Sequence, residues 1–553
     1  MALLISALAA CSSGARKQTL DPKLGAVTLV LYNADVRTMD PAHPTATAVA
    51  LAGDQIVAVG SDAEVRALAA SSTRQIDLAG KTVTPGLIDA HCHLYGLGLD
   101  RESVSVRHLG SEQAVAAKAA EEAKSRPAGE WLLGRGWDQN LWPGQQFPNK
   151  ATLDAAISDR PVLLRRIDGH AAWVNSKALA AANITAATKD PPGGKILRDA
   201  KGEPTGVLVD NAEDLVAAVV PPPSAAVRER RIRAAAKLAI EAGITGVHEM
   251  GIEDETAAVY RQLAAKGELP LRVYAFLQGN PADLARVRVA PEPATGWFVM
   301  KGVKYYSDGA LGSRGARLYR PYDDDADNKG LWVTEPEKLA QAVDAAVSGG
   351  WQVATHAIGD AAVGSVLDAY LAAQKKHEGD RRLRIEHTQI IEMDDVPRMV
   401  DAKAIASMQP THATSDMPWA EQRIGANRIK GAYAWRTMLD KGIPLAFGSD
   451  FPIEEVPPLL GIYAAVTRQD ANGKPDGGWY PKQRLTLDEA IAAFTRGAAY
   501  AEFAENTRGM IAVGRVADLT VFDRKLRADR SLLETHAMLT IVGGKIVHEA
   551  PAK

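Results

Sequence analysis

Cysteine is scarce in this sequence: Cys11 and Cys92 are its two cysteines in 553 residues. If Cys11 carries a lipid, no disulfide can form, so the cysteine count does not indicate a redox compartment. Neither sign of charge is in large excess, because the formal net charge is -3 at pH 7. A nucleic acid or an acidic membrane surface is therefore not an expected partner. No internal repeat or long low-complexity segment is evident.

A hydrophobic run at the N-terminus, residues 1–10, is too short to span a bilayer but fits the apolar core of a secretory signal. Small residues precede Cys11 and a Ser-Ser-Gly stretch follows it, which resembles a bacterial lipoprotein signal. This pattern predicts that residues 1–24 are a signal and tether, with the protein lipid-anchored or periplasmic in the bacterial cell envelope. Because no Lys or Arg precedes the run, a disordered tail on a cytoplasmic protein is the alternative.

The length suits one large domain with a smaller one, and 46% hydrophobic with 24% charged residues is an ordinary globular composition. Near both ends, short apolar runs alternate with turn signals, in residues 27–59 and again in 517–547 around Gly543-Gly544. These runs predict hairpin strands. We expect the two ends of the chain to pair into one small β domain.

The middle of the chain, from about Thr84 to Tyr500, alternates apolar strands with amphipathic helices. Ser224 is predicted to start one helix, and Thr334 and Thr486 each to head a capping box. A predicted helix lies between most pairs of successive strands. The resulting eight strand–helix units predict a (β/α)8 barrel. The predicted strands are residues 86–90, 244–249, 271–276, 298–304, 351–356, 383–387, 404–409 and 444–449.

The stretch between His93 and Ile244 is too long for a single barrel connection. It contains apolar runs and Pro-Gly-rich turns of its own. We predict that residues 101–223 form an insertion that covers the barrel mouth.

Two histidines, His91 and His93, end the first predicted strand. Side chains alternate along a strand, so the two imidazoles should share one face and form half of a metal site. Cys92 lies between them and should point to the opposite face, where we expect it to pack rather than to ligate. A surface His pair is the alternative for a lone His-x-His.

Other predicted strands also end in residues that ligate metals or move protons: Lys304, His356, His387 and Asp450. Strand ends of a barrel face one mouth, where barrel active sites lie. Each residue has a structural alternative, since a His can bond a backbone carbonyl, a Lys can pair with a carboxylate and an Asp can be a turn residue. Their occurrence together on successive strands favours a metal site.

These motifs, in this order, resemble the amidohydrolase superfamily, in its amidohydrolase-3 (YtcJ-like) branch. The resemblance covers nearly the whole chain after Leu24. It implies a metal-dependent hydrolase barrel over residues 84–505, with a composite β-sandwich built from 25–83 and 506–553. The matching motifs are Thr84-Pro85-Gly86-Leu87-Ile88-Asp89-Ala90-His91-Cys92-His93 and residues 166–170, 304–314, 355–360, 386–387, 409–410, 448–450 and 514–519.

A ligand set for two metal ions follows from the resemblance. It implies that His91 and His93 with Asp450 hold one ion and that His356 and His387 hold a second. Lys304 would bridge them as an N-carboxylated side chain, because an ammonium has no lone pair to offer. His and carboxylate ligands suit Zn²⁺. A single-metal site, with Lys304 an ordinary cation, is the alternative.

The expected reaction is attack of metal-bound hydroxide on a carbonyl, with Asp450 as general base and then acid. His170 and His248 are candidate donors to the developing oxyanion, although each could instead be a buried His bonded to backbone.

The resemblance implies hydrolysis of a non-peptide C–N bond, of the amide or formamide type, in a small molecule. Trp137 and Trp419 are expected to wall the pocket, unless they are core residues. Arg314 is expected to bind a carboxylate, or else to pair with an acid. An esterase, lactonase or phosphotriesterase on the same site is the alternative within enzymes. A non-catalytic binding lipoprotein would need a broken ligand set, and all six positions hold competent residue types. Oligomeric state does not follow from the sequence.

Overall fold

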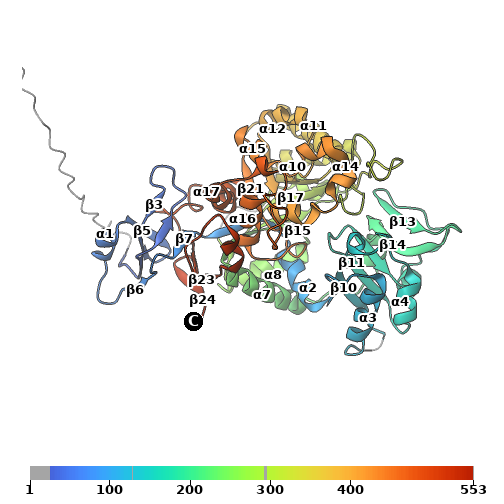
Figure 1. Cartoon of the computed structure of the whole chain (residues 1–553), viewed down its shortest axis with the longest axis horizontal. Coiled ribbons are helices and arrows are strands. Elements are labelled where there is room, and N and C mark those ends of the chain that lie inside the picture. Colours follow the sequence, from blue (N-terminus) through green and yellow to red (C-terminus); the bar gives the residue numbers. More distant parts are fainter. Residues whose placement is uncertain (1–24, 128, 292–295, 552–553) are drawn as a thin grey trace, which may run out of the picture.

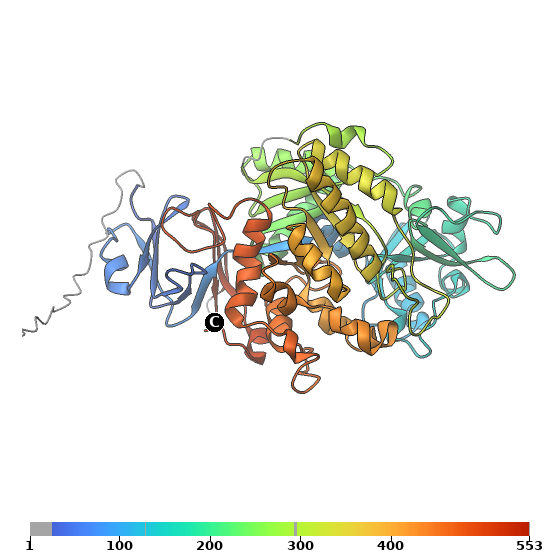
Figure 2. The ribbon, with the colours of Figure 1, turned by 90° about the horizontal axis from the view of Figure 1, so that it is seen from above.

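The computed structural model describes residues 25–127, 129–291 and 296–551. Three parts follow one another along the long axis (Figures 1 and 2). A β-rich part lies at one end, a barrel lies in the centre, and a second α/β part lies at the other end. The predicted signal and Cys11 lie outside the described residues. In the ranges given above, no helix has the length and apolar character needed to cross a membrane.

Eight parallel strands form the central barrel, as the sequence predicts, so the predicted fold class is confirmed. The strands are three to nine residues long and almost entirely buried, as expected for strands that are covered on both faces. In sheet order the strands are β8 (Leu87–Cys92), β15 (Ile244–Ile252), β16 (Arg272–Gln278), β17 (Phe298–Tyr306), β18 (Gln352–Ala357), β19 (Arg384–His387), β20 (Ile405–Met408) and β21 (Leu445–Phe447).

Polar groups close the barrel between β21 and β8. The carboxylate of Asp89 accepts hydrogen bonds from the backbone N–H of Ser449 at 3.1 Å and from its hydroxyl at 2.6 Å. Gly448 allows this close approach, because a Cβ there would lie 2.4 Å from the backbone nitrogen of His91. The end of β8 and the loop after β21 are therefore held in direct contact.

Helices surround the barrel. The predicted start at Ser224 is confirmed, since its side chain caps α7, and the Thr486 capping box is present. The capping box predicted at Thr334 is wrong: Glu335 is the N-cap without a side-chain bond, and Pro336 opens the helix. The helices are α2 (Leu94–Glu102), α7 (Ala225–Glu241), α8 (Asp254–Ala265), α9 (Ala285–Arg288), α10 (Pro336–Ser348), α11 (Asp360–Lys376), α12 (Val396–Asp401), α13 (Pro410–Asp416), α14 (Ala420–Arg428), α15 (Trp435–Asp440), α16 (Pro458–Thr467), α17 (Leu487–Ala492) and α18 (Ala498–Ala501).

The β-rich part combines both ends of the chain. One sheet has the order β5-β4-β1-β6 and the other β24-β23-β22-β7-β2-β3, in which Val521 of β22 pairs with Val83 of β7. A shared apolar core includes Leu31, Val49 and Ile541. The strands are β1 (Leu29–Tyr32), β2 (Asp35–Arg37), β3 (Thr45–Ala46), β4 (Ala48–Ala52), β5 (Gln55–Gly60), β6 (Arg74–Asp77), β7 (Thr82–Pro85), β22 (Leu519–Phe522), β23 (Ala537–Val542) and β24 (Lys545–Glu549), and α1 (Asp62–Arg66) follows β5.

The part at the other end is a six-stranded sheet with its own helices, between α2 and α7 in the chain (teal in Figure 1). We call it the insertion. Its residues and the barrel strand ends together line a cavity of about 1310 Å³. The insertion therefore covers the barrel mouth. Its elements are β9 (Val104–Ser105), α3 (Glu112–Ala123), β10 (Leu132–Trp137), α4 (Lys150–Ala156), β11 (Val162–Arg166), β12 (Ala171–Val174), α5 (Ser176–Ala181), β13 (Gly194–Arg198), β14 (Pro204–Asp210) and α6 (Asp214–Ala217).

Candidate metal centre

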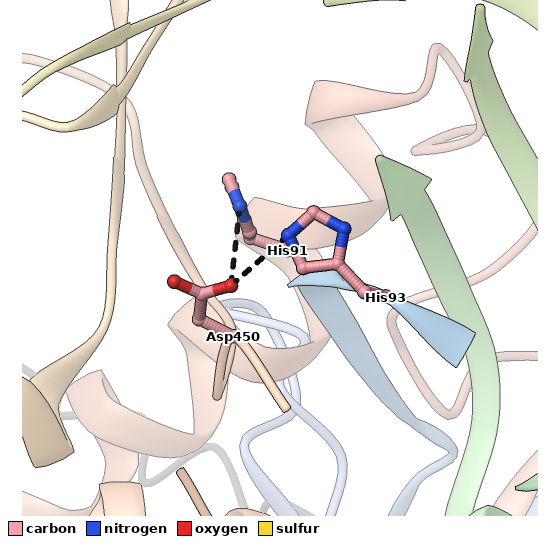
Figure 3. A group of neighbouring side chains, drawn as sticks. All are labelled: His91, His93 and Asp450. Carbon is pink, nitrogen blue, oxygen red and sulfur yellow. Dashed lines mark ion pairs between the residues drawn. The ribbon is translucent and has the colours of Figure 1, made fainter. Parts of the chain in front are cut away.

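A His–His–Asp group lies at the barrel mouth (Figure 3). His91 is the next-to-last residue of β8, His93 follows the strand directly, and Asp450 follows β21. Oδ1 of Asp450 lies 3.3 Å from Nε2 of His93 and 3.6 Å from Nε2 of His91. One ligand atom of each residue lies within 4.8 Å of the other two, so the three can hold one metal ion.

Backbone hydrogen bonds fix this group in place. The N–H of Asp450 donates to the carbonyl of His91 at 2.7 Å, and the N–H of His93 donates to the carbonyl of Phe451 at 2.8 Å. Asp450 has a left-handed backbone conformation, with φ at 63°. Asp and Asn tolerate this conformation better than most residues. The turn after β21 thus aims the carboxylate at the end of β8.

The imidazoles present lone pairs to the carboxylate. Nδ1 of His93 lies 3.0 Å from the carbonyl of Met250, which can only accept, so Nδ1 carries the proton. Nδ1 of His91 lies 2.5 Å from the carboxylate of Glu386, which is also an acceptor, so this Nδ1 carries a proton as well. Burial and the nearby Lys304 lower the pKa of His91 to about 4. Both Nε2 atoms face Oδ1 of Asp450, so the two imidazoles and the carboxylate can converge on one cation.

A second group shares Asp450 and contains a residue that the sequence did not reveal. His387, His412 and Asp450 also bring one ligand atom each within 4.8 Å of the others. Nε2 of His412 lies 3.7 Å from Oδ2 of Asp450. Within the described residues, Nε2 of His412 and Oδ1 of Asp450 are buried and have no hydrogen-bond partner. Orphaned buried atoms of these types fit a metal ion, because they are otherwise costly to bury.

Lys304 and His356 lie beside these groups on the same cavity wall. Nζ of Lys304 is buried 3.5 Å from Nε2 of His91, and burial lowers the pKa of this amine to about 8. The ring of His356 lies 4.6 Å from that of His387, centroid to centroid. Burial holds the pKa of His356 well below its usual value, which keeps this imidazole neutral. All six predicted ligands thus line one cavity, although His356 and Lys304 belong to neither three-residue group.

Two other predicted residues reach the cavity, His170 from the insertion and Trp419 from the barrel. Nδ1 of His170 lies 2.7 Å from Oδ1 of Asp210, and its ring lies 4.9 Å from that of His356. Asp210 is a partner that the sequence did not reveal, because it lies 40 residues further along the chain.

Three predicted residues do not line the cavity. His248 is fully buried below the site, where Arg384 lies 2.7 Å from its Nδ1. Trp137 belongs to the apolar core of the insertion and donates its indole N–H to the carbonyl of Leu164. Arg314 pairs with Asp324 at 3.0 Å. We therefore correct their predicted roles: none of the three is placed to touch a substrate.

The comparisons with known proteins agree with this geometry. A model described as "Amidohydrolase family" matches residues 74–548. The chain belongs to this family. It is 37% identical over 489 residues to "Putative amidohydrolase YtcJ" of Bacillus subtilis (strain 168), covering 86% of this chain and 91% of that protein. The resemblance seen in the sequence is therefore confirmed, and the protein is a metal-dependent hydrolase of this family.

Two further similarities bear on the chemistry. The chain is 30% identical over 546 residues to "N-substituted formamide deformylase" of Arthrobacter pascens, covering 94% of this chain and 98% of that protein. A crystal structure of an uncharacterized metal-dependent hydrolase from Pyrococcus horikoshii OT3 matches with a TM-score of 0.72 and 27% identity, over 90% of this chain and 97% of that one.

His412→Ala should weaken metal binding by about 10- to 100-fold, the usual effect of removing a group that supports or ligates a metal. The physical reason is the orphaned Nε2, 3.7 Å from Asp450. Competition with a chromogenic chelator measures the affinity. The matched control is His43→Ala, whose side chain is 83% exposed. Equal affinities in the two variants would remove His412 from the metal centre.

Proposed function

We propose that this amidohydrolase-family protein cleaves an amide or formamide C–N bond in a small molecule, using metal held at the barrel mouth. The observation that carries the proposal is the convergence of His91 Nε2, His93 Nε2 and Asp450 Oδ1 on the wall of a large cavity. The similarity to a formamide deformylase supports the bond type. A cavity of about 1310 Å³ has room for a small molecule.

We propose Zn²⁺ as the metal, because neutral imidazole and carboxylate are ligands that suit it. Two ions are favoured, since the two groups share only Asp450. Bound there, the metal would polarise a carbonyl oxygen and lower the pKa of a water molecule. Lys304, buried next to His91, would join the ligand set as an N-carboxylated side chain.

The residues around the centre have separate roles in this proposal. Asp450 would hold and return a proton at its carboxylate, since it is the acid that both histidine groups face. His170 would orient the substrate carbonyl through Nε2, because its Nδ1 is engaged by Asp210. Trp419 would provide apolar wall.

Lys304→Ala should reduce the metal content from about two to one or fewer equivalents per chain when the protein is purified with bicarbonate. The variant removes the side chain whose N-carboxylated form is proposed to bridge the two ions. Elemental analysis measures the content. Lys301→Ala, on the same strand but outside the cavity lining, is the control. One equivalent in the wild type, unchanged by the mutation, would indicate a single-metal site with Lys304 as an ordinary cation.

A matched substrate panel tests the bond type. We expect turnover of N-phenethylformamide by the metal-loaded protein, with slower or no turnover of phenethyl formate, relative to the uncatalysed rates. Preference for the ester, or for a lactone or phosphotriester, would replace the C–N assignment with one of those activities. No turnover of any of them, with an intact metal centre, would favour a non-catalytic binding protein.

We also propose that the protein is anchored to the bacterial cell envelope through a lipid on Cys11, on the pattern of residues around this cysteine. Intact-mass spectrometry of membrane-extracted protein should find no residue before Cys11 and an added lipid mass. A soluble protein that retains Met1 would contradict the proposal and favour the cytoplasm.

A further inference from the structure

Three arginines lie close together on the face of the insertion that lines the cavity. Arg107 follows β9, Arg135 lies in β10 and Arg165 lies in β11 (Figure 1 labels β10 and β11). Arg135 and Arg165 are direct partners in the register of the two strands. Leu133, two positions before Arg135 in β10, shares the same face. We call these three residues the arginine face.

Like charges directly opposite one another destabilise a sheet, so this arrangement needs a compensating group. Among the described residues, Arg135 forms no ion pair. It donates one hydrogen bond, from Nη2 to the carbonyl of Ile167 at 2.8 Å, while its Nε is buried without a partner. Burial and the nearby Arg107 lower the pKa of Arg135 to about 10, which still leaves it positive at neutral pH.

The acids near the arginine face pair with it only at long range. Arg107 lies 3.8 Å from Asp100, and Arg165 lies 3.8 Å from Glu213, both too far for a direct hydrogen bond. In the part of the chain that the structure describes, neither carboxyl oxygen of Glu213 has a hydrogen-bond partner. Burial raises the pKa of Glu213 to about 8, so this side chain is mostly uncharged at neutral pH.

Two other acids of the cavity wall are already engaged. Asp168 pairs with Arg166 at 2.5 Å, and Asp210 lies 2.7 Å from His170. Positive charge is therefore in local surplus on the arginine face. The arginine face and the metal centre line the same cavity, so one small molecule can reach both.

We propose that the arginine face, centred on Arg135, binds a carboxylate of the substrate, so that the substrate is an amide or formamide bearing an anionic group. A guanidinium offers a planar fork of donors that matches a carboxylate. Such a ligand would take up the unpartnered donors of Arg135 and relieve the repulsion from Arg165. This carboxylate site rests on the proposed function, because it would bind the other end of the substrate whose C–N bond is cleaved.

Two compounds that differ only by a carboxylate test this. The kcat/KM of the full-length, metal-loaded protein is measured for N-formylphenylalanine and for N-phenethylformamide, its analogue without the carboxylate. We expect the wild type to prefer the acid by about tenfold or more, and Arg135→Gln to bring the ratio close to one. Arg320→Gln, a surface arginine outside the cavity, should keep the wild-type ratio. A wild type without preference, or an unchanged ratio in Arg135→Gln, would overturn the proposal.

A second variant and a binding measurement cover the remaining outcomes. If Arg135→Gln does not fold by circular dichroism, Arg135→Lys keeps the charge but loses the fork, and the ratio should fall several-fold. If neither compound is hydrolysed, the proposed function fails, and calorimetry with 3-phenylpropionate decides the anion site alone. Weaker binding in the Arg135 variant than in Arg320→Gln would support the site. Equal affinities, or no binding to the wild type, would overturn it.

Discussion

Asp450→Asn should lower kcat by about 10³-fold or more even with metal in excess, within the range for loss of a general acid–base group. Asp450 is the acid shared by both histidine groups, and its oxygens lie 3.3 to 4.0 Å from four imidazoles. Burial opposes ionisation, but the surrounding histidines hold the pKa of Asp450 well below its usual value. An amide at this position has no charge to give a metal and cannot take up a proton.

Asparagine is the informative substitution because of the backbone. The φ of 63° at position 450 suits Asn, so the turn and its hydrogen bond to the carbonyl of His91 should survive. Turnover of N-phenethylformamide is measured at saturating metal, with metal content and melting temperature recorded beside it. Asp476→Asn, whose side chain is 87% exposed, is the control. Turnover within about tenfold of the wild type would exclude Asp450 as the proton carrier.

The barrel could be predicted from the sequence because each strand is a short apolar run between turn signals. The same regularity predicted that the residues at the strand ends meet, since the carboxyl ends of parallel strands in a barrel share one mouth. The helix start at Thr334 could not be resolved in this way. There Pro336, which fits the first helical position, fixes the start one residue later than an N-cap at Thr334 predicts.

The rest of the candidate site depends on contacts between distant segments. His412 lies inside the short helix α13 rather than at a strand end, and its only local signal is the preceding Gln409-Pro410 motif. Asp210 meets His170 through pairing of β12 with β14 in the insertion. Trp137 gave a misleading signal, because a tryptophan in an insertion packs in that insertion's own core as readily as it walls a pocket. The hydrophobic periodicity of a segment does not show which distant residues its side chains will contact.

Arg384→Met should destabilise the barrel by about 3–5 kcal/mol, because it leaves a buried charge without its partner. Arg384 is fully buried. It donates to Glu386 at 2.8 Å and to the carbonyl of Ala90 at 2.6 Å, and Glu386 in turn lies 2.5 Å from His91. Although burial raises it, the Arg384 guanidinium and His91 hold the pKa of Glu386 well below its usual range. The loss of stability is measured as a lower urea midpoint of unfolding. The control is Arg524→Met, which removes an arginine paired with Glu534 at the surface.

The double variant Arg384→Met/Glu386→Leu separates stability from metal binding. Removing both charges abolishes the uncompensated carboxylate, so the urea midpoint should recover most of the loss. Nδ1 of His91 would then have no acceptor to fix its tautomer and orientation, so metal affinity should stay about 10- to 100-fold below the wild type. Recovery of both properties would mean that Glu386 serves only to neutralise Arg384. Recovery of stability alone would show that this buried ion pair exists to hold His91 toward the metal.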